Sequence, residues 1–447
     1  MIMRLEVLAG SGYNVRLPGK LARQAGIKAN RGTIEVRVGQ RVVAARYSLS
    51  TMVATVALSE ALLSKLSLRR GMRLHVQFDQ KQLRIGPLVG ILVPGTRGGF
   101  NPVGNMTLGV GYFIEQGRYA GSYPFAFAAG AMDFQRGLVK GYTLSSLGGD
   151  GFRWIRRTFP LPDVVYNHIT YRRRERAADI RRLFSRLEEQ GIPVFNTGYF
   201  GKWDVHNWLS THEALAPHLP EMHQLGLETL QEMLTRYSRV FIKPDHGSLG
   251  RKIVVVTRSG NHFLFRRGRG TLQVMVKDLN GVINRLPKLT RDVYLVQQGL
   301  NLCRYRGRRR DFRLIMQRNG TGRWLITKFF ARVAPGGQLV ANISAGATGL
   351  PAGRSLRRCF SAAKTKSILK EMKQVARLVC HTLTEVMDDR LGELGIDLGV
   401  DTGGHVWIIE VNSKPHRKVY DTMDDKPSAK LSFRRPMQFA QYLAGFK

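Results

Sequence analysis

One pattern occurs twice within residues 13–78, and this repeat limits the fold more than any other feature of the sequence. Each copy has an alternating apolar–polar stretch, a Leu-x-x-x-Leu segment, a basic-Gly turn and a second alternating stretch, over 13–38 and 54–78. Alternation with a period of two is typical of half-buried strands, and one such unit cannot bury its apolar face alone. The two copies therefore predict a single small β-barrel over residues 1–86, with a docking or recognition role.

The rest of the chain divides into two regions by its pattern of strands and helices. From 87 to 200, apolar strand-like runs such as "GPLVGILVPG" alternate with a helical stretch that stops at Gly191, which predicts a small parallel α/β domain. From 201 to 447, antiparallel strand patterns and a long amphipathic helix over 364–390 predict an α+β domain. A chain of 447 residues with 43% hydrophobic side chains can form several such cores.

The charge of the chain constrains its partners more than its fold. Lys and Arg number 70 against 32 Asp and Glu, for a net charge of +38, which attracts nucleic acid, anionic surfaces, nucleotides or acidic polypeptides. A general compositional bias produces the same imbalance. Three cysteines without a C-x-x-C pair indicate a reducing compartment. Because no apolar run reaches the roughly 20 residues of a membrane helix, we expect a soluble cytoplasmic protein without a membrane span.

The stretch "GIDLGVDTGGHVWIIEVN" over 395–412 has the pattern of a β-hairpin. The glycines at 403–404 suit a two-residue turn, because both central positions of such a turn need positive φ. In the register set by that turn, Val400 faces Trp407. In the same register, Asp397 faces Glu410.

Three oxygen-bearing side chains then converge at the end of this hairpin. Asn412 follows Glu410 by two residues and therefore shares its face, opposite Asp397. Two facing carboxylates repel, so we expect a positive group between them, and hard oxygen ligands favour Mg²⁺ or Mn²⁺. Asp401 lies at the tip and is a poor ligand. A solvated strand end remains the alternative interpretation.

A second stretch, "FIKPDHGSLGRK", carries features of a phosphate-binding turn. A strand delivers Lys243, and Gly247 and Gly250 flank Ser248 in the turn that follows. Backbone N–H groups in such a turn can hold phosphate while the lysine adds charge, although an ordinary Gly-rich hairpin has the same pattern.

A third stretch, "RGRRRDFRLIMQ", places Asp311 and Arg313 on one face at the start of a strand. An arginine there can hold a phosphoryl group through two parallel hydrogen bonds. The preceding arginines at 304–310 are predicted to form an exposed loop, which is either a solvated face or a surface that admits an anionic substrate.

Taken together, these elements resemble the ATP-grasp superfamily, and within it the YheC/YheD-type, spore-coat-associated family. The resemblance rests on "FNTGYFGKWDVHNWLS", "FIKPDHGSLGRKI", "YLVQQGLNL", "DFRLIMQRNGTGRWLITKFFARVAPGGQLVANISAGA" and "GIDLGVDTGGHVWIIEVNSKP", across about 195–420. It implies two α+β lobes, over about 201–298 and 299–447, preceded by the small α/β domain. The N-terminal barrel looks like the double-psi type.

The resemblance also implies roles for individual residues. ATP would lie between the lobes, with Lys202 and Lys243 on its phosphates and the turn from Gly247 to Gly250 closing over them. The remaining implied contacts are Gln297 and Gln298 at the adenine, Asp397, Glu410 and Asn412 at Mg²⁺, Arg313 at the transferred phosphoryl group, and Arg332 and Asn342 on the acceptor side. The chain departs from the family pattern at Lys252, which stands where a glycine is common and could itself contact phosphate.

Three functions stay open at this point. The resemblance implies an ATP- and Mg²⁺-dependent carboxylate–amine ligase that forms an acylphosphate, and the charge favours an acidic peptide, protein or surface polymer as acceptor. The second is a non-catalytic, spore-coat-associated protein that retains the nucleotide fold. The third, nucleic-acid binding, is supported by charge alone.

Overall fold

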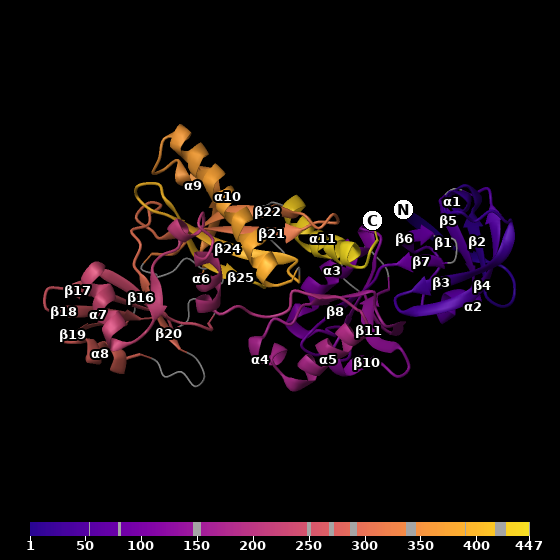
Figure 1. Cartoon of the computed structure of the whole chain (residues 1–447), viewed down its shortest axis with the longest axis horizontal. Coiled ribbons are helices and arrows are strands. Elements are labelled where there is room, and N and C mark those ends of the chain that lie inside the picture. The colour runs from indigo at the N-terminus through magenta and orange to yellow at the C-terminus, as the bar shows by residue number, and fades with distance from the viewer. Residues whose placement is uncertain are drawn as a thin grey trace.

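The computed structural model describes residues 1–52, 54–78, 82–145, 153–247, 252–267, 272–286, 293–336, 346–388, 390–415 and 426–446. These residues form one closed barrel and three further sheets. The barrel lies at one end of an elongated molecule and the sheet of β15 to β20 at the other, with the two remaining sheets between them (Figure 1).

The N-terminal barrel is built from both copies of the repeat. Its elements are β1 (Ile2–Leu8), β2 (Asn14–Pro18), α1 (Gly19–Gln24), β3 (Arg31–Val38), β4 (Arg41–Ser50), β5 (Thr55–Ser59), α2 (Glu60–Lys65), β6 (Arg73–Phe78) and β7 (Gln82–Gly86). The strands close in the order β1-β5-β2-β4-β3-β7-β6, with β6 pairing back to β1. A strand of one copy pairs with a strand of the other, since β2 pairs with β5. The predicted closed barrel is confirmed, whereas its double-psi type stays a prediction.

The second sheet mixes parallel and antiparallel strands. Its elements are β8 (Leu88–Leu92), η1 (Gly104–Met106), α3 (Thr107–Tyr119), β9 (Tyr123–Phe127), η2 (Ala129–Ala131), β10 (Met132–Asp133), β11 (Leu138–Leu144), β12 (Trp154–Pro160), β13 (Val164–Asn167), α4 (Arg172–Glu175), α5 (Ala178–Glu189) and β14 (Val194–Phe195). Strands β9, β8, β13 and β14 are parallel, but β11 is antiparallel to β9, β10 and β12. The predicted parallel α/β domain therefore has an antiparallel edge, because β10 and β11 are joined by a short turn, which permits only antiparallel pairing.

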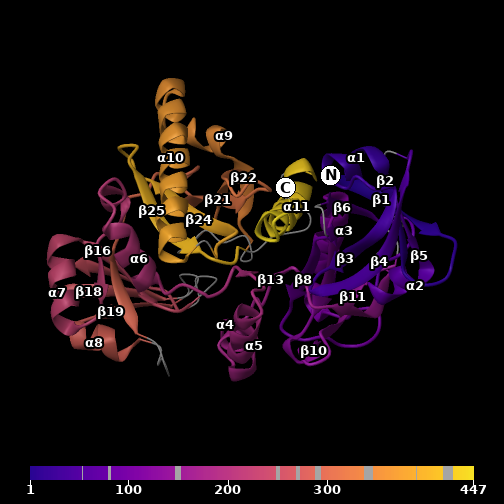
Figure 2. The ribbon, with the colours of Figure 1, turned by 45° about the vertical axis from the view of Figure 1, so that its right-hand side comes forward.

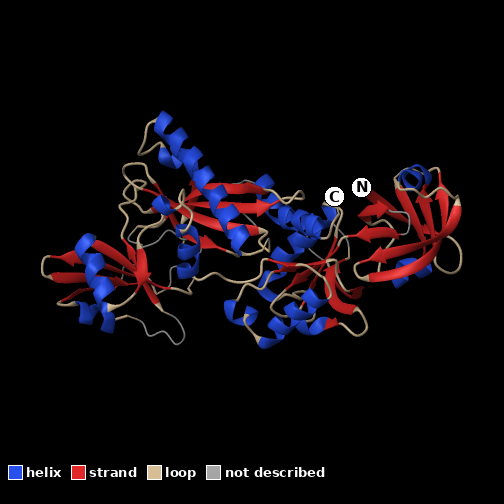
Figure 3. Ribbon diagram, viewed as in Figure 1, coloured by secondary structure: helices blue, strands red, loops and turns tan. Residues whose placement is uncertain are grey.

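The third sheet lies at the far end from the barrel and is antiparallel throughout. It contains β15 (Met222–Gln224), β16 (Arg239–Pro244), β17 (Val254–Ser259), β18 (His262–Arg267), β19 (Leu272–Val276) and β20 (Tyr294–Gln298), in the order β15-β20-β16-β17-β18-β19. The helices of this region are α6 (Lys202–Ser210), η3 (Ala216–His218), α7 (Leu227–Arg236) and α8 (Leu279–Asn284). Strands β16 to β19 follow one another directly in the chain, between α7 and α8, and Figure 3 shows helices beside this sheet.

The fourth sheet carries the predicted hairpin and packs against the long helix. It contains β21 (Arg310–Arg318), β22 (Trp324–Val333), β23 (Thr348–Pro351), β24 (Glu393–Val400) and β25 (Val406–Asn412), in the order β23-β22-β21-β24-β25. The helices are α9 (Ala352–Leu356), α10 (Ala362–Val386) and α11 (Lys426–Leu443). The predicted apolar stripe of α10 is buried from Ile368 to Leu383, whereas Val386 at the end of the helix is exposed.

Helix α11 joins the fourth sheet to the second. Its Phe433, Met437 and Phe439 belong to one core with Phe113 of α3 and Phe195 of β14, and α11 also packs against β21. Figure 2 shows α11 between the two regions. Within the described residues, no helix is long and apolar enough to span a membrane. The division of the chain at 86/87 and 200/201 stays a prediction.

Candidate functional site

The hairpin of β24 and β25 brings the predicted carboxylates together, but its register differs from the predicted one near the turn. Asp397 lies opposite Glu410, as predicted, but Val400 lies opposite Val406 rather than Trp407. The register shifts by one between these pairs, which leaves Ile409 as the extra residue of a β-bulge. The turn is one residue longer than predicted, which would shift every pair of the hairpin by one residue. The extra residue of the bulge offsets this shift, so Asp397 still lies opposite Glu410.

The turn itself is longer than two residues because Asp401 closes it. The Asp401 amide donates to the carbonyl of His405, and Oδ1 of Asp401 accepts from the amides of Gly403 and His405 at 2.9 Å each. Only Gly404 of the glycine pair has positive φ, at 94°. The prediction of two positive-φ glycines is therefore wrong. Asp401 serves the turn, and its exclusion from the ligand set stays a prediction.

Three buried side chains and the half-buried Arg313 form what we call the arginine–aspartate network: Asp311, Arg313, Arg332 and Asp397. Arg332 donates to both oxygens of Asp311 at 2.6 and 2.7 Å, and its Nη2 lies 3.0 Å from Oδ1 of Asp397. Arg313 donates through Nε and Nη2 to the two oxygens of Asp397. Burial opposes the charge of Arg332, but the two aspartates outweigh burial and raise its pKa. Each charge in this network therefore has a partner within the protein.

A positive group lies beside each of the facing carboxylates, whereas a positive group between them stays a prediction. Asp397 has Arg313 and Arg332, and Oε1 of Glu410 lies 3.8 Å from Nζ of Lys202. Both oxygens of Asp397 are thus engaged by arginine, whereas the one ion pair that Glu410 makes with a described residue is long. The assignment of Asp397 as a metal ligand stays a prediction that requires Arg313 to release it.

A cavity of about 890 Å³ lies beside the hairpin. The predicted residues that line it are Lys202, Lys243, Gly247, Gln297, Glu410 and Asn412. They come from α6, β16 and the turn after it, β20 and β25, and so span about 200 residues of chain. The fold therefore gathers on one cavity residues that the sequence spreads over separate motifs.

Lys202 and Lys243, the lysine pair, lie on the wall formed by α6 and β16. Nζ of Lys202 donates to the carbonyls of Asp245 and Gly247 at 3.0 and 2.9 Å. Lys243 is only 7% exposed, and burial together with Lys202 lowers its pKa to about 8. A buried ammonium is costly without an anion, so this wall favours an anionic ligand.

The turn after β16 is described only in part. Gly247 is the last described residue on this side of the turn, and Ser248 and Gly250 lie outside the described residues. Lys252, on the far side, has φ of 63°, a conformation that glycine adopts without strain. The lysine therefore takes the backbone conformation that suits the glycine common at this position.

The two glutamines of β20 point in different directions. Gln297 is buried and lines the cavity. Oε1 of Gln298 accepts from the amide of Glu221 at 3.2 Å, and Gln298 is not among the lining residues. Side chains alternate across a strand, so only Gln297 is positioned to contact a ligand with its side chain.

Glu410 and Asn412 fit a hard divalent cation. A carboxylate and a carboxamide oxygen on one face of β25 both line the cavity, and Mg²⁺ favours such oxygen ligands. Nδ2 of Asn412 is buried and has no hydrogen-bond partner within the described chain. A buried amide of this kind is stabilised by an acceptor such as a phosphate oxygen.

The second sheet supplies a wall of the cavity that sequence reasoning missed. Lys414 lines the cavity, and its Nζ donates to Oε1 of Glu175 at 2.7 Å and to the carbonyl of Ile169 at 3.0 Å. Arg172, also on the lining, donates to the carbonyl of Phe200 at 3.1 Å. The only sequence signal for Lys414 was its place in the "KP" that follows the hairpin, and this pair of residues is not a recognisable motif by itself.

Two further predictions concern the basic loop and the acceptor side. Arg310 is 3% exposed and donates to Oγ of Ser355 at 2.9 Å and to Sγ of Cys303 at 2.7 Å, so the prediction that the whole loop is exposed is wrong. These partners engage the two terminal nitrogens of the guanidinium, whereas its Nε is buried without a hydrogen-bond partner among the described residues. Arg332 lies in the arginine–aspartate network, and Asn342 lies outside the described residues.

These features define a class of protein: a cavity between the sheets carries paired lysines on one wall and oxygen ligands on another, the organisation of an ATP-grasp protein. The profile of the YheC/D like ATP-grasp family matches residues 191–443, more than half of the chain. The protein belongs to this family, and the resemblance drawn from the sequence is confirmed.

Relatives extend the match over most of the chain. The endospore coat-associated protein YheD of Bacillus subtilis (strain 168) is 28% identical over 436 residues, covering 96% of this chain and 93% of YheD. The endospore coat-associated protein YheC of the same organism is 23% identical over 297 residues, covering 65% and 80%. Among solved structures, D-alanyl-alanine synthetase A from Vibrio cholerae gives a TM-score of 0.48 at 15% identity, covering 81% of this chain and 98% of that one.

Proposed function

We propose that the protein is an ATP- and Mg²⁺-dependent ligase that joins a carboxylate to an amine. The observation that carries this proposal is the cavity, which gathers Lys202 and Lys243 on one wall and Glu410 and Asn412 on another. Phosphoryl transfer depends mainly on positioning and charge neutralisation, and these residues suit both tasks. ATP would lie between the proposed lobes 201–298 and 299–447.

The proposed reaction has two steps. A substrate carboxylate oxygen attacks the γ-phosphorus of ATP, and the bond from that phosphorus to the bridging oxygen breaks. ADP departs, and the substrate is now an acylphosphate. An amine nitrogen then attacks the acyl carbon, inorganic phosphate leaves with the bonding pair, and the nitrogen loses a proton to solvent. We assign Arg313 to the transferring phosphoryl group and Lys243 to the phosphates.

The chain's own residues would divide the binding tasks. Gln297 and the backbone beside Gln298 would hold the adenine, and Glu410 and Asn412 would hold Mg²⁺ or Mn²⁺, with Asp397 as third ligand once Arg313 turns to substrate. The metal, when bound, supplies positive charge at the phosphate oxygens. We assign Ser248, Gly250 and Lys252 to the phosphates as well, through the turn that carries them.

We propose a polyanionic acceptor: an acidic peptide, protein or surface polymer. The net charge of +38 and the exposed Arg304, Arg306 and Arg308 support it, because such a field attracts acidic chains. Arg332 and Asn342 are our candidates for acceptor-side contacts. The names of the relatives support a setting at the spore coat, reached from the cytoplasm.

A second candidate function is a non-catalytic, coat-associated protein that retains the nucleotide fold. One observation favours it: both oxygens of Asp397 are held by Arg313 and Arg332, which leaves two of the three proposed metal ligands free of strong partners. In this case ATP would be a structural ligand, and the barrel over 1–86 would mediate assembly.

The test is calorimetric titration of ATP with and without Mg²⁺, followed by an assay of ADP release with acidic peptides. Wild type is expected to bind ATP in a Mg²⁺-dependent manner, and the Asp397→Asn/Glu410→Gln double variant is expected to lose that dependence. A Glu385→Gln/Asp388→Asn variant, which removes two exposed carboxylates near the end of α10, is the matched control.

The outcomes separate the candidates. ADP release that depends on an acceptor and is lost in Glu410→Gln supports the ligase. Mg²⁺-dependent binding without ADP release from any acceptor favours the structural candidate. Absence of ATP binding by the wild type would overturn both.

A further inference from the structure

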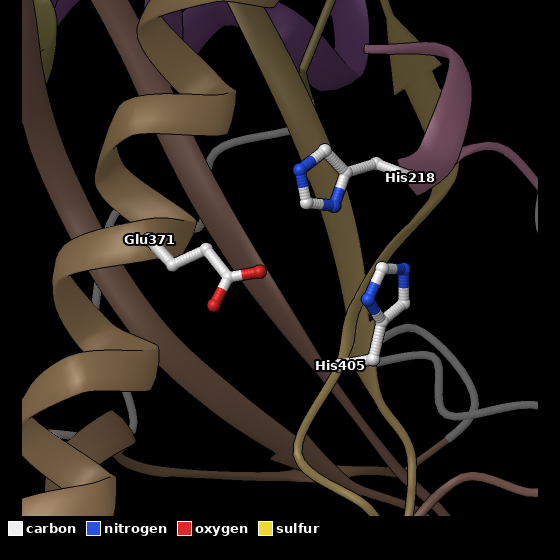
Figure 4. Close-up of side chains that lie close together, drawn as sticks. All are labelled: His218, Glu371 and His405. Carbon is white, nitrogen blue, oxygen red and sulfur yellow. The ribbon is translucent and has the colours of Figure 1, made fainter. Parts of the chain in front are cut away.

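A second group of ligating side chains lies outside the cavity, where the tip of the β24–β25 hairpin meets η3 and α10 (Figure 4). His218 ends η3, Glu371 lies on α10, and His405 lies in the hairpin turn. One ligand atom of each residue lies within 4.8 Å of the other two, and all three side chains are half-buried. None of the three lines the cavity. We call this group the His–Glu–His cluster.

Two backbone carbonyls determine which nitrogen of each histidine faces the cluster. Nδ1 of His218 lies 2.7 Å from the carbonyl oxygen of Val406, and Nε2 of His405 lies 3.0 Å from that of Pro217. A carbonyl oxygen can only accept, so both of these nitrogens carry the proton. In the neutral rings, Nε2 of His218 and Nδ1 of His405 are therefore free to act as ligands.

The remaining atoms of the cluster form a set of acceptors without a donor. The two rings stack with centroids 5.2 Å apart, and the carboxylate of Glu371 faces them (Figure 4). Within the described part of the chain, no hydrogen bond or ion pair engages that carboxylate. Two imidazole lone pairs and a carboxylate that face one another are stabilised by a cation between them.

We propose that His218, Glu371 and His405 bind a divalent transition-metal ion of the zinc class. Zinc takes imidazole nitrogen and carboxylate oxygen at about 2.0–2.2 Å, which places tetrahedral ligand atoms about 3.4 Å apart. Small side-chain rotations bring atoms already within 4.8 Å to that spacing. Three protein ligands leave a fourth position for water.

The surroundings of the cluster match those of metal sites. Metal-binding histidines usually donate their second nitrogen to a carbonyl or carboxylate, which fixes the ring, and both histidines here do so. The nitrogen-containing ligand set also differs from the oxygen ligands of Glu410 and Asn412, so the two sites would select different metals.

The ion would connect parts of the molecule that flank the nucleotide cavity. His218 lies just before β15 of the third sheet, whereas His405 precedes β25, which carries Glu410 and Asn412. A bound ion would hold the segment that leads into β15 against this hairpin. We therefore infer a structural role that fixes the orientation of the two proposed lobes.

The test is Zn²⁺ binding to the full chain, measured by competition with a chromophoric chelator in buffer with excess Mg²⁺. Wild type is expected to bind one equivalent. His218→Ala and Glu371→Gln are expected to bind at least tenfold more weakly. His381→Ala, which removes an exposed histidine of α10, is the matched control and is expected to keep the equivalent. Co²⁺ in place of Zn²⁺ is expected to give the intense visible spectrum of four-coordinate cobalt.

Two further results decide the matter. Lys364, whose Cε would lie 2.7 Å from a Cβ at Gly404, brings positive charge to the same hairpin tip, so Lys364→Met is expected to bind Zn²⁺ several-fold more tightly. Unfolding midpoints of all variants establish that they fold. No Zn²⁺ binding by the wild type, or equal binding by wild type and Glu371→Gln, would overturn the proposal and leave the histidines as a hydrogen-bonded crosslink only.

Discussion

The arginine–aspartate network and the lysine pair both contain buried charged groups, but these charges are paired with opposite charges only in the network. In the network, Arg332 and Arg313 each form two hydrogen bonds to a carboxylate. In the lysine pair, Lys243 is buried, and its pKa is lowered to about 8 by burial and by the neighbouring Lys202.

The contrast separates the paired charges of the arginine–aspartate network from the underpaired charge of Lys243, which in the proposed function binds an anionic ligand. A fully paired buried charge is costly to disrupt, because removal of one partner strands the other. An underpaired buried cation destabilises the free protein and gains most when an anion arrives. We therefore expect substitutions in the two groups to change stability in opposite directions.

The largest effect is expected from Arg332→Met. The change leaves Asp311 buried without its bidentate partner, so the free energy of unfolding should fall by about 3–5 kcal/mol. Chemical denaturation monitored by circular dichroism measures it. Arg323→Met, at an exposed position, should change stability by no more than about 0.5 kcal/mol. A loss similar to that of the control would show that the network does not support the fold.

Lys243→Met should not lower the free energy of unfolding, in contrast to Arg332→Met. Removal of a buried charge should leave the free energy of unfolding unchanged or higher, while ATP affinity falls about 10- to 100-fold through loss of a charge-assisted contact. Denaturation and calorimetry on the same preparation measure both quantities. Lys366→Met, an exposed lysine of α10, should alter neither. A clear loss of stability in Lys243→Met would contradict the comparison.

The smallest expected effect is the uptake of a fraction of a proton by Lys243 when ATP binds. Because the pKa of Lys243 is about 8 in the folded chain, below the ordinary value of 10.5, the unfolded state binds more protons between these values. The free energy of unfolding from this group therefore rises with pH across that window, and below pH 8 the cost is fully present. In the proposed site ATP binds the protonated form of Lys243, so binding above pH 8 should take up protons.

Calorimetry in two buffers with different ionisation enthalpies measures this uptake. Lys414 also has a pKa lowered to about 8 by burial, but it is already paired with Glu175. Lys243→Arg keeps the charge without titrating in this range, so uptake should vanish in that variant. Uptake that persists there would assign the proton to another group.

Local patterns in the sequence predicted much of the fold. Alternating residues identified the barrel strands, and the apolar stripe from Ile368 to Leu383 identified the long helix. The pairing of Asp397 with Glu410 was also predicted, although through a turn that the structure replaces with a longer one and a bulge. Strand and helix periodicity depends on neighbours in the chain, which is why these features were accessible.

Features that depend on distant contacts were not accessible. Helix α11 is apolar on the sides that meet Phe113 and Phe195, but nothing near it in the chain indicates those partners. The antiparallel edge of the second sheet and the burial of Arg310 depend likewise on the residues that surround them.

The sequence by itself determined the family, the repeat barrel and the residue types of the candidate site, because motif spacing and periodicity are properties of short segments. Only the tertiary structure decided which charges are paired. Arg313 and Asp397 are 84 residues apart in the chain, and the sheet places them side by side. Burial and pairing depend on the whole surroundings of a side chain, so the difference between a paired arginine and an underpaired buried lysine exists only in the folded molecule.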